Sequence, residues 1–291
     1  MKIGVIYPQM ELGKGPDCTR DYAQAVEELG YSFISTYEHI VGGNSNQPDW
    51  DKPFDYSTPF HEPFVMFGFM AGCTKMIGFM TRILILSQRQ TVLVAKQAAT
   101  LDVLCGGRLR LGVGIGWNEV EYISQGENFH NRGERIEEQV ILLRKLWTCS
   151  LVSYESNWHT IPDVGINPLP AQRPIPIWIG GHSDVALRRV ARLGDGWLPN
   201  DLSFPDTKSA IQKLKHYIVE EGRPITDIGI DPRLSYGEGV QNSWRIKIQD
   251  WKALGATHLS IDTMGFGFSS IDDHLKALET FAKEINLNVW L

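Results

Sequence analysis

The sequence lacks several patterns that would assign it to a specialised class of protein. Its four cysteines are widely separated and form no C-x-x-C pair, so neither a zinc knuckle nor a redox dithiol is indicated. Reduced thiols in a cytoplasm are the simplest expectation, and a disulfide is the alternative. No apolar stretch approaches the ~18 residues of a membrane span, and the first residues, which have a strand pattern, lack the apolar core of a signal peptide. We therefore expect a cytoplasmic protein without a membrane partner.

Other absences narrow the function further. The formal charge of -6 is mild and no run of Lys and Arg is present, so we expect no nucleic-acid partner. The eight histidines show no metal-ligand spacing, so we expect no metal site. The sequence contains neither a G-x-S-x-G nucleophile elbow nor a P-loop. Its composition, 43% hydrophobic and 21% charged, is that of an ordinary globular protein with a full-sized core.

What the sequence does contain is a regular alternation of short apolar runs and amphipathic stretches that end at glycine. Strands are predicted at residues 2–8, 31–37, 76–86, 108–113, 175–179, 196–199, 228–235 and 258–262. Helices are predicted at residues 17–29, 91–104, 132–147, 184–193, 206–221, 243–254 and 272–285. This alternation is typical of parallel strands covered by helices, and its eight strands favour a (β/α)8 TIM barrel over an open sheet. No linker divides the chain, so one domain is expected over residues 1–291.

Two long segments interrupt this alternation and predict insertions after strands 2 and 4. Residues 41–61 are rich in Asn, Asp, Pro and aromatics, and residues 151–170 contain a pattern typical of a small hairpin. Long loops are usually functional or disordered, and the loops that follow barrel strands face the active site. The first segment, around Trp50 and Phe54, is therefore interpreted as a lid over the substrate, with a surface excursion as the alternative.

Two glycine clusters follow predicted strands. The first, at residues 112–118, would let the backbone approach a planar ring or a phosphate. A tight turn with packing glycines is the alternative, and the spacing G-x-G-x-G fits a dinucleotide fingerprint poorly. The second, at residues 180–184, begins a helix whose N-terminus could hold an anion. Ser183 would contact a phosphate there, or simply cap the helix.

Three polar residues near predicted strand ends are candidates for a functional site. Glu38 and His39 lie just past the second strand, where a His beside a carboxylate can act as an acid, a base or a hydrogen-bond donor. Arg82 interrupts the third strand, and a buried charge there needs a partner. Either Arg82 faces the helix layer with a carboxylate, or it reaches a ligand.

Several blocks of sequence, in this order, resemble the luciferase-like monooxygenase superfamily, and in particular its branch of probable coenzyme F420-dependent oxidoreductases. The blocks are residues 83–90, 94–102, 106–118, 176–181 and 192–199. The resemblance spans most of the chain. It implies a barrel with a flavin or deazaflavin ring at the carboxyl ends of the strands.

The resemblance also implies roles for individual residues. Glu38 and His39 match the pair beside the ring and the substrate, which makes them the expected catalytic residues. The other matches are expected to bind the cofactor: a third-strand segment behind the ring that often has a non-proline cis peptide, a fourth-strand loop, and a phosphate-binding loop. These residues are Thr81, Arg82 and Ile83, then Gly114, Gly116 and Asn118, then Gly180, Gly181, His182 and Ser183.

Two positions depart from the family pattern. Arg82 stands where a small residue is usual, and Trp117 stands where the sugar-phosphate dehydrogenases carry a carboxylate. The second departure argues against a sugar phosphate as the substrate.

The function implied by the resemblance is hydride transfer between coenzyme F420 and a small organic substrate. The alternatives are an FMN-dependent monooxygenase that uses reduced FMN and O2, and a non-catalytic flavin-binding protein. A barrel hydrolase would need paired carboxylates, and Glu38 and Asp262 form no convincing pair in the sequence. Family members are often dimers, so a homodimer is possible by resemblance, although the sequence shows no apolar stripe that would mark an interface.

Overall fold

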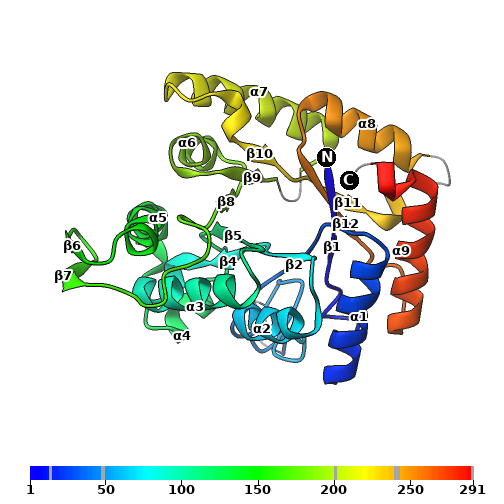
Figure 1. The fold of residues 1–291 in the computed structure, drawn as a ribbon, viewed down its shortest axis with the longest axis horizontal. Helices are drawn as coiled ribbons and strands as arrows, with labels where there is room; N and C mark the ends of the chain where they lie inside the picture. Colours follow the sequence, from blue (N-terminus) through cyan, green and yellow to red (C-terminus); the bar gives the residue numbers. More distant parts are fainter. Residues whose placement is uncertain (13–14, 47–49, 200–201, 239–242, 290–291) are drawn as a thin grey trace.

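The chain forms an α/β fold built on one curled parallel sheet (Figure 1). The structure is a computed structural model that describes residues 1–291 except 13–14, 47–49, 200–201, 239–242 and 290–291. The strands of the main sheet are β1 (Lys2–Ile6), β2 (Phe33–Thr36), β3 (Gly78–Thr81), β4 (Leu84–Ile85), β5 (Leu109–Gly114), β8 (Ile177–Gly180), β9 (Gly196–Leu198), β10 (Gly229–Ile230), β11 (Arg233–Ser235) and β12 (His258–Asp262).

The two end strands of the curled sheet are close together in the chain. The strand order runs β10-β9-β8-β5-β3-β2-β1-β12-β11, with β4 beside β5, and each of these pairs is parallel. The two end strands, β10 and β11, are separated in the chain by Asp231 and Pro232 alone. The Asp231 amide donates to the carbonyl of Trp197 on β9, and the Ser260 amide of β12 donates to the carbonyl of Pro232. One stretch of chain therefore contacts both ends of the curled sheet.

Helices surround the sheet (Figure 1). They are α1 (Pro16–Glu28), α2 (Pro63–Cys73), α3 (Thr91–Leu104), α4 (Glu119–Ser124), α5 (Arg132–Thr148), α6 (Asp184–Leu193), α7 (Phe204–Glu220), α8 (Trp244–Leu254) and α9 (Ile271–Ile285). Short 3-10 turns are η1 (Leu86–Gln88), η2 (Phe129–Asn131), η3 (Ile225–Asp227), η4 (Tyr236–Glu238) and η5 (Leu287–Val289). Within the described ranges, no helix has the length and apolar character needed to cross a bilayer.

Every predicted strand is found, but two are broken. The third strand divides into β3 and β4, and the seventh into β10 and β11. Helices α2 and α4 occupy segments for which the sequence pattern predicts none. Helix α2 is apolar on nearly all sides and therefore shows no helical period, and α4 is too short to show one.

The two long segments differ in local structure. Residues 37–62 connect β2 to α2, without a helix or strand among the residues described there. Strands β6 (Val152–Glu155) and β7 (Thr160–Val164) form an antiparallel hairpin between α5 and β8, which confirms the predicted hairpin.

A small cluster of side chains fills the inside of the sheet. Phe33, Met80, Trp178 and Leu198 pack together there, apart from the larger core between sheet and helices. A Cβ atom at Gly196 would lie 2.2 Å from the Trp178 ring, so glycine makes room for the indole. The interior is therefore a packed layer of side chains, as in parallel barrels.

Candidate functional site

A cavity of about 640 Å³ opens at the carboxyl ends of the strands. Its lining comes from segments that follow β1, β2, β3, β5 and β12, together with residues of β4, β11 and β12 themselves. The lining residues are Met10, Glu11, Tyr37, Glu38, His39, Lys52, Pro53, Phe54, Phe60, Arg82, Ile83, Ile85, Gly116, Trp117, Arg233, Asp262, Met264 and Gly265. This volume suits a small ligand or cofactor ring, and strand ends of this kind carry the ligand sites of parallel α/β barrels.

His39 lies in an aromatic wall of this cavity. Its ring centroid is 3.8 Å from that of Phe54, 4.9 Å from Phe60 and 5.8 Å from Trp117. Its Nδ1 atom is 2.6 Å from Oε1 of Glu121, on α4. The carboxylate that contacts His39 is therefore Glu121 and not its sequence neighbour Glu38.

Glu38 is buried and both of its oxygens are engaged. Oε2 accepts from the Ile85 amide at 2.6 Å, and Oε1 accepts from the Arg89 guanidinium, which also contacts Glu62 at 3.0 Å. Burial raises the pKa of Glu38, and the positive charge of Arg89 opposes that rise. These contacts make Glu38 an anchor between the end of β2 and the β4 segment.

Arg82 is buried inside the curled sheet. Its guanidinium lies 3.2 Å from Oδ2 of Asp231, and it donates to the Asp231 carbonyl at 3.0 Å and to Ser260 Oγ at 3.4 Å. Burial raises the pKa of Asp231, and the charge of Arg82 opposes that rise. Arg82 thus has the carboxylate partner expected for a buried charge. It does not face the helix layer, however, but points to the inside of the sheet and lines the cavity.

The segment around Ile83 forms a wall of the cavity. The peptide bond between Arg82 and Ile83 is cis, where the resemblance implies one. Thr81 Oγ1 donates to the Gly112 carbonyl at 2.6 Å, which ties the end of β3 to β5. A Cβ at Gly114 would lie 2.6 Å from the Ile83 side chain, and one at Gly180 would lie 3.0 Å from it. Glycine at both positions therefore leaves room for this side chain.

The fourth-strand loop adds two more of the predicted residues. Gly116 lines the cavity and has φ of +62°, a conformation that favours glycine. Asn118 is buried, and its Nδ2 atom has no hydrogen-bond partner among the described residues. A buried donor of this kind is costly unless a ligand or water satisfies it.

The fifth-strand loop lies outside the cavity lining. Gly181 has φ of +109°, and its carbonyl accepts from Trp197 Nε1 at 2.7 Å. His182 is exposed. Ser183 Oγ accepts from the Ala186 amide at 3.2 Å, so this side chain caps α6. The cap accounts for Ser183, while its predicted phosphate contact stays a prediction.

The sequence pattern did not predict a polar group on the other side of the cavity. The Tyr37 hydroxyl donates to Asp262 Oδ2 at 3.2 Å, and Arg233 approaches the same oxygen at 3.4 Å. The Met264 amide donates to Asp262 Oδ1 at 3.0 Å. Burial raises the pKa of both Tyr37 and Asp262. The position of Asp262 at the end of the last predicted strand was the available signal.

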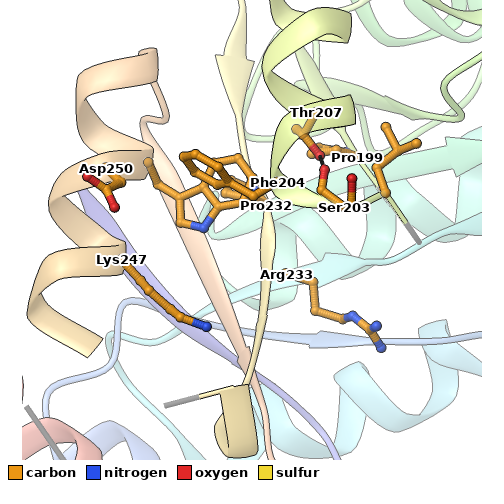
Figure 2. A pocket seen from close by; sticks show the side chains of 10 residues that line it. Pro199, Ser203, Phe204, Thr207, Pro232, Arg233, Lys247 and Asp250 are labelled. Carbon is orange, nitrogen blue, oxygen red and sulfur yellow. Dashed lines mark hydrogen bonds between the residues drawn. The ribbon is translucent and has the colours of Figure 1, made fainter. Parts of the chain in front are cut away.

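A second cavity of about 460 Å³ adjoins Arg233, which lines both cavities. Figure 2 shows Lys247 and Asp250 on one helix, with Arg233 on a neighbouring strand. The remaining lining residues are Pro199, Leu202, Ser203, Phe204, Thr207, Pro232 and Trp251. This cavity belongs to segments that carry none of the predicted site residues.

A curled parallel sheet with a cavity at its strand ends defines a class of α/β proteins to which many enzymes belong. Within this class, residues 2–245 match the family described as luciferase-like monooxygenase. The chain belongs to this family.

Relatives of the chain include proteins named for two different cofactors. An uncharacterized protein of Mycobacterium tuberculosis is 35% identical over 208 residues, which are 69% of this chain and 71% of that protein. An F420-dependent glucose-6-phosphate dehydrogenase of Microbacterium testaceum is 26% identical over 76% of this chain and 65% of its own length. An FMNH(2)-dependent dimethylsulfone monooxygenase of Pseudomonas putida is 27% identical over 74% of this chain and 57% of its own.

Solved structures agree with the fold. The monooxygenase RslO1 from Streptomyces bottropensis superposes with a TM-score of 0.82 at 18% identity, over 99% of this chain and 100% of that one. The coenzyme F420 dependent tetrahydromethanopterin reductase from Methanopyrus kandleri gives 0.78 at 15% identity, over 99% of both chains. At these identities the likeness concerns the fold alone.

Proposed function

We propose that the protein is an oxidoreductase that transfers hydride between coenzyme F420 and a small organic substrate in the cavity of about 640 Å³. The observation that carries this proposal is the wall formed by Ile83, with glycines at positions 114 and 180 beside it. A planar ring needs such a flat, apolar wall, and side chains larger than glycine at these positions would displace Ile83.

The residues around this wall fit a deazaflavin. Arg82 and Ile83 would back the ring, and Gly116 would allow close approach of the loop after β5. The Nδ2 atom of Asn118, which has no partner among the described residues, would donate to a polar group of the cofactor. The N-terminus of α6, with Gly180, Gly181, His182 and Ser183, would hold its phosphate. When bound, the deazaflavin supplies the hydride chemistry, while the protein positions the reactants.

The opposite side of the cavity would bind the substrate. Phe54, Phe60 and Trp117 form an apolar wall that excludes water from the reacting groups. The segment that carries Phe54 would act as a lid. His39 would orient the substrate or hold the proton that the reaction releases. Glu38, with both oxygens engaged, would fix the backbone beside the ring instead of exchanging protons.

An FMN-dependent monooxygenase is the alternative, because one relative of similar identity is named as FMNH(2)-dependent. Anaerobic titration of the protein with F420 and with FMN, followed by cofactor fluorescence, distinguishes the two. We expect saturable binding of F420. Tight binding of FMN with none of F420 would refute the proposal, and binding without turnover of any substrate in a broad screen would favour a non-catalytic flavin-binding protein.

A matched pair of variants tests the cofactor loop in the same titration. Gly181 and Gly222 both have positive φ, +109° and +69°, so alanine is strained at each. Gly222 ends α7, and its surroundings leave open space for a Cβ. We expect Gly181→Ala to weaken F420 binding at least about tenfold, which corresponds to about 1.4 kcal/mol, and Gly222→Ala to leave it unchanged. Equal affinities would show that the phosphate loop is misplaced.

A further inference from the structure

The contact between His39 and Glu121 joins two segments that follow different strands. His39 follows β2, and Glu121 lies in α4, which follows β5. Nδ1 of His39 and Oε1 of Glu121 are 2.6 Å apart, which is a short charge-assisted hydrogen bond. The contact depends on α4, a helix of six residues that begins two residues after the cavity-lining Trp117.

The surroundings of this contact are largely apolar. The Glu121 side chain is 0% exposed and that of His39 is 13% exposed. Phe54, Phe60 and Trp117 surround the imidazole. The second oxygen of Glu121, Oε2, has no partner among the described residues. Burying the Glu121 carboxylate costs desolvation free energy, and the hydrogen bond to His39 is the main interaction that offsets this cost.

The direction of this hydrogen bond decides which nitrogen of His39 carries the hydrogen. With Glu121 as a carboxylate, which can only accept, Nδ1 carries the hydrogen. Nε2 lies on the opposite edge of the ring and makes no hydrogen bond within the described part of the chain. As a neutral ring in this tautomer, His39 therefore presents an unprotonated nitrogen.

We propose that Glu121 is the positioning residue of the site, holding His39 in the Nδ1–H tautomer so that Nε2 accepts a proton in the cavity. Its catalytic consequence rests on the function proposed above. The proton that leaves the substrate as hydride departs is bound by Nε2, and the resulting imidazolium is stabilised by the Glu121 carboxylate. On return of the proton to solvent or product, the ring is neutral again.

The first test needs no cofactor. The ring nitrogens of His39, assigned by comparison with His39→Gln, report the tautomer in 15N–1H NMR spectra at a pH where the ring is neutral. We expect the Nδ1–H form in the wild type and a mixture with the Nε2–H form in Glu121→Gln. Glu119→Gln, which changes an exposed carboxylate of the same helix, should leave the His39 signals unchanged. A wild-type ring in the Nε2–H form would overturn the proposal, even if no Glu121 variant folds.

The second test uses turnover with whichever cofactor binds. We expect Glu121→Gln to lower kcat by about 10- to 100-fold with little change in KM, the range found for carboxylates that orient metal-bound His. Glu121→Asp, which keeps the charge at a shorter reach, should recover part of the loss. In the His39→Gln background, Glu121→Gln should cost nothing further. A further loss of kcat in that double variant would contradict the proposal. An inactive wild type would instead refute the proposed function, and the NMR result would then decide the role of Glu121.

Discussion

At the scale of single residues, the buried pair of Arg82 and Asp231 connects the site to the inside of the sheet. Asp231 lies between β10 and β11, where the seventh strand is broken, and it also accepts from Ser260 Oγ at 3.1 Å through either oxygen. The guanidinium of Arg110 stacks over Phe33, 4.2 Å from its ring centroid, and contributes a further positive charge near Asp231. The break in the strand therefore places the Asp231 carboxylate beside the buried Arg82 and near the half-buried Arg110.

We predict that removing either partner alone is strongly destabilising. Asp231→Asn leaves Arg82 without its counter-charge in a site where its side chain is 2% exposed, and should lower the free energy of unfolding by about 3–5 kcal/mol. The double variant Arg82→Met with Asp231→Leu should lose less than the sum of the single changes, because no charge is left unpaired. Urea denaturation measures these differences.

The control for this prediction is Arg20→Met. Arg20 contacts Asp17 and Asp21 on the exposed face of α1, where ion pairs contribute little. Its unfolding free energy should therefore remain within about 0.5 kcal/mol of the wild type. If Asp231→Asn is as mild as this control, the interior pair does not stabilise the fold in the way argued.

The carboxylate that contacts His39 could not be predicted from the sequence. A carboxylate next to a His in the chain, Glu38, was the visible candidate, yet consecutive residues of an extended segment point in different directions. Glu121 is distant in sequence from His39 and comes to it through the loop after β5. Glu121 lies in the short helix α4, which the sequence pattern does not predict, so no local signal pairs it with His39.

At the scale of the elements, periodicity and glycine stops located the strands and most of the helices, because these depend on local burial. The breaks in the third and seventh strands depend on tertiary contacts. In the third, Arg82 turns inward to Asp231; in the seventh, Asp231 and Pro232 interrupt the pairing, and proline cannot donate to a sheet. Helix α2 is not predicted for a local reason: a helix without polar residues on its outer face shows no hydrophobic period in the sequence.

The packing of β9 against the interior cluster gives a prediction at this scale. Gly196→Ala would place a Cβ 2.2 Å from the large, buried ring of Trp178, so β9 or the ring must move. We expect a loss of about 1–3 kcal/mol in the free energy of unfolding. Gly133→Ala in α5 is the matched control, because its Cβ would meet only the flexible end of Arg189 at 3.4 Å. That change should be neutral or stabilising by up to about 1 kcal/mol. Equal losses in the two variants would mean that the interior is looser than the contacts indicate.

At the scale of the whole molecule, α2 and α3 pack side by side on the outside of the sheet (Figure 1). Helix α2 contains no charged residue, and Val65 and Phe69 on its outer face are 73% and 45% exposed. Met76, just beyond its end, and Leu93 on α3 are exposed as well. Exposed apolar side chains on neighbouring helices usually mark an interface when they form one patch.

We therefore predict that two copies of the chain associate through the outer face of α2. A twofold axis brings the same stripe of both copies together, so a single helix suffices for a self-complementary contact. Light scattering after size exclusion should give twice the chain mass of 32.8 kDa for the wild type. The double variant Val65→Glu with Phe69→Glu should give a monomer, because it places like charges opposite each other in the contact. Val219→Glu, at a similarly exposed position on α7, should remain a dimer. A monomeric wild type would contradict the assignment of this face, and so would dissociation caused by Val219→Glu alone. If the monomeric variant retains its affinity for F420, each copy carries a complete site.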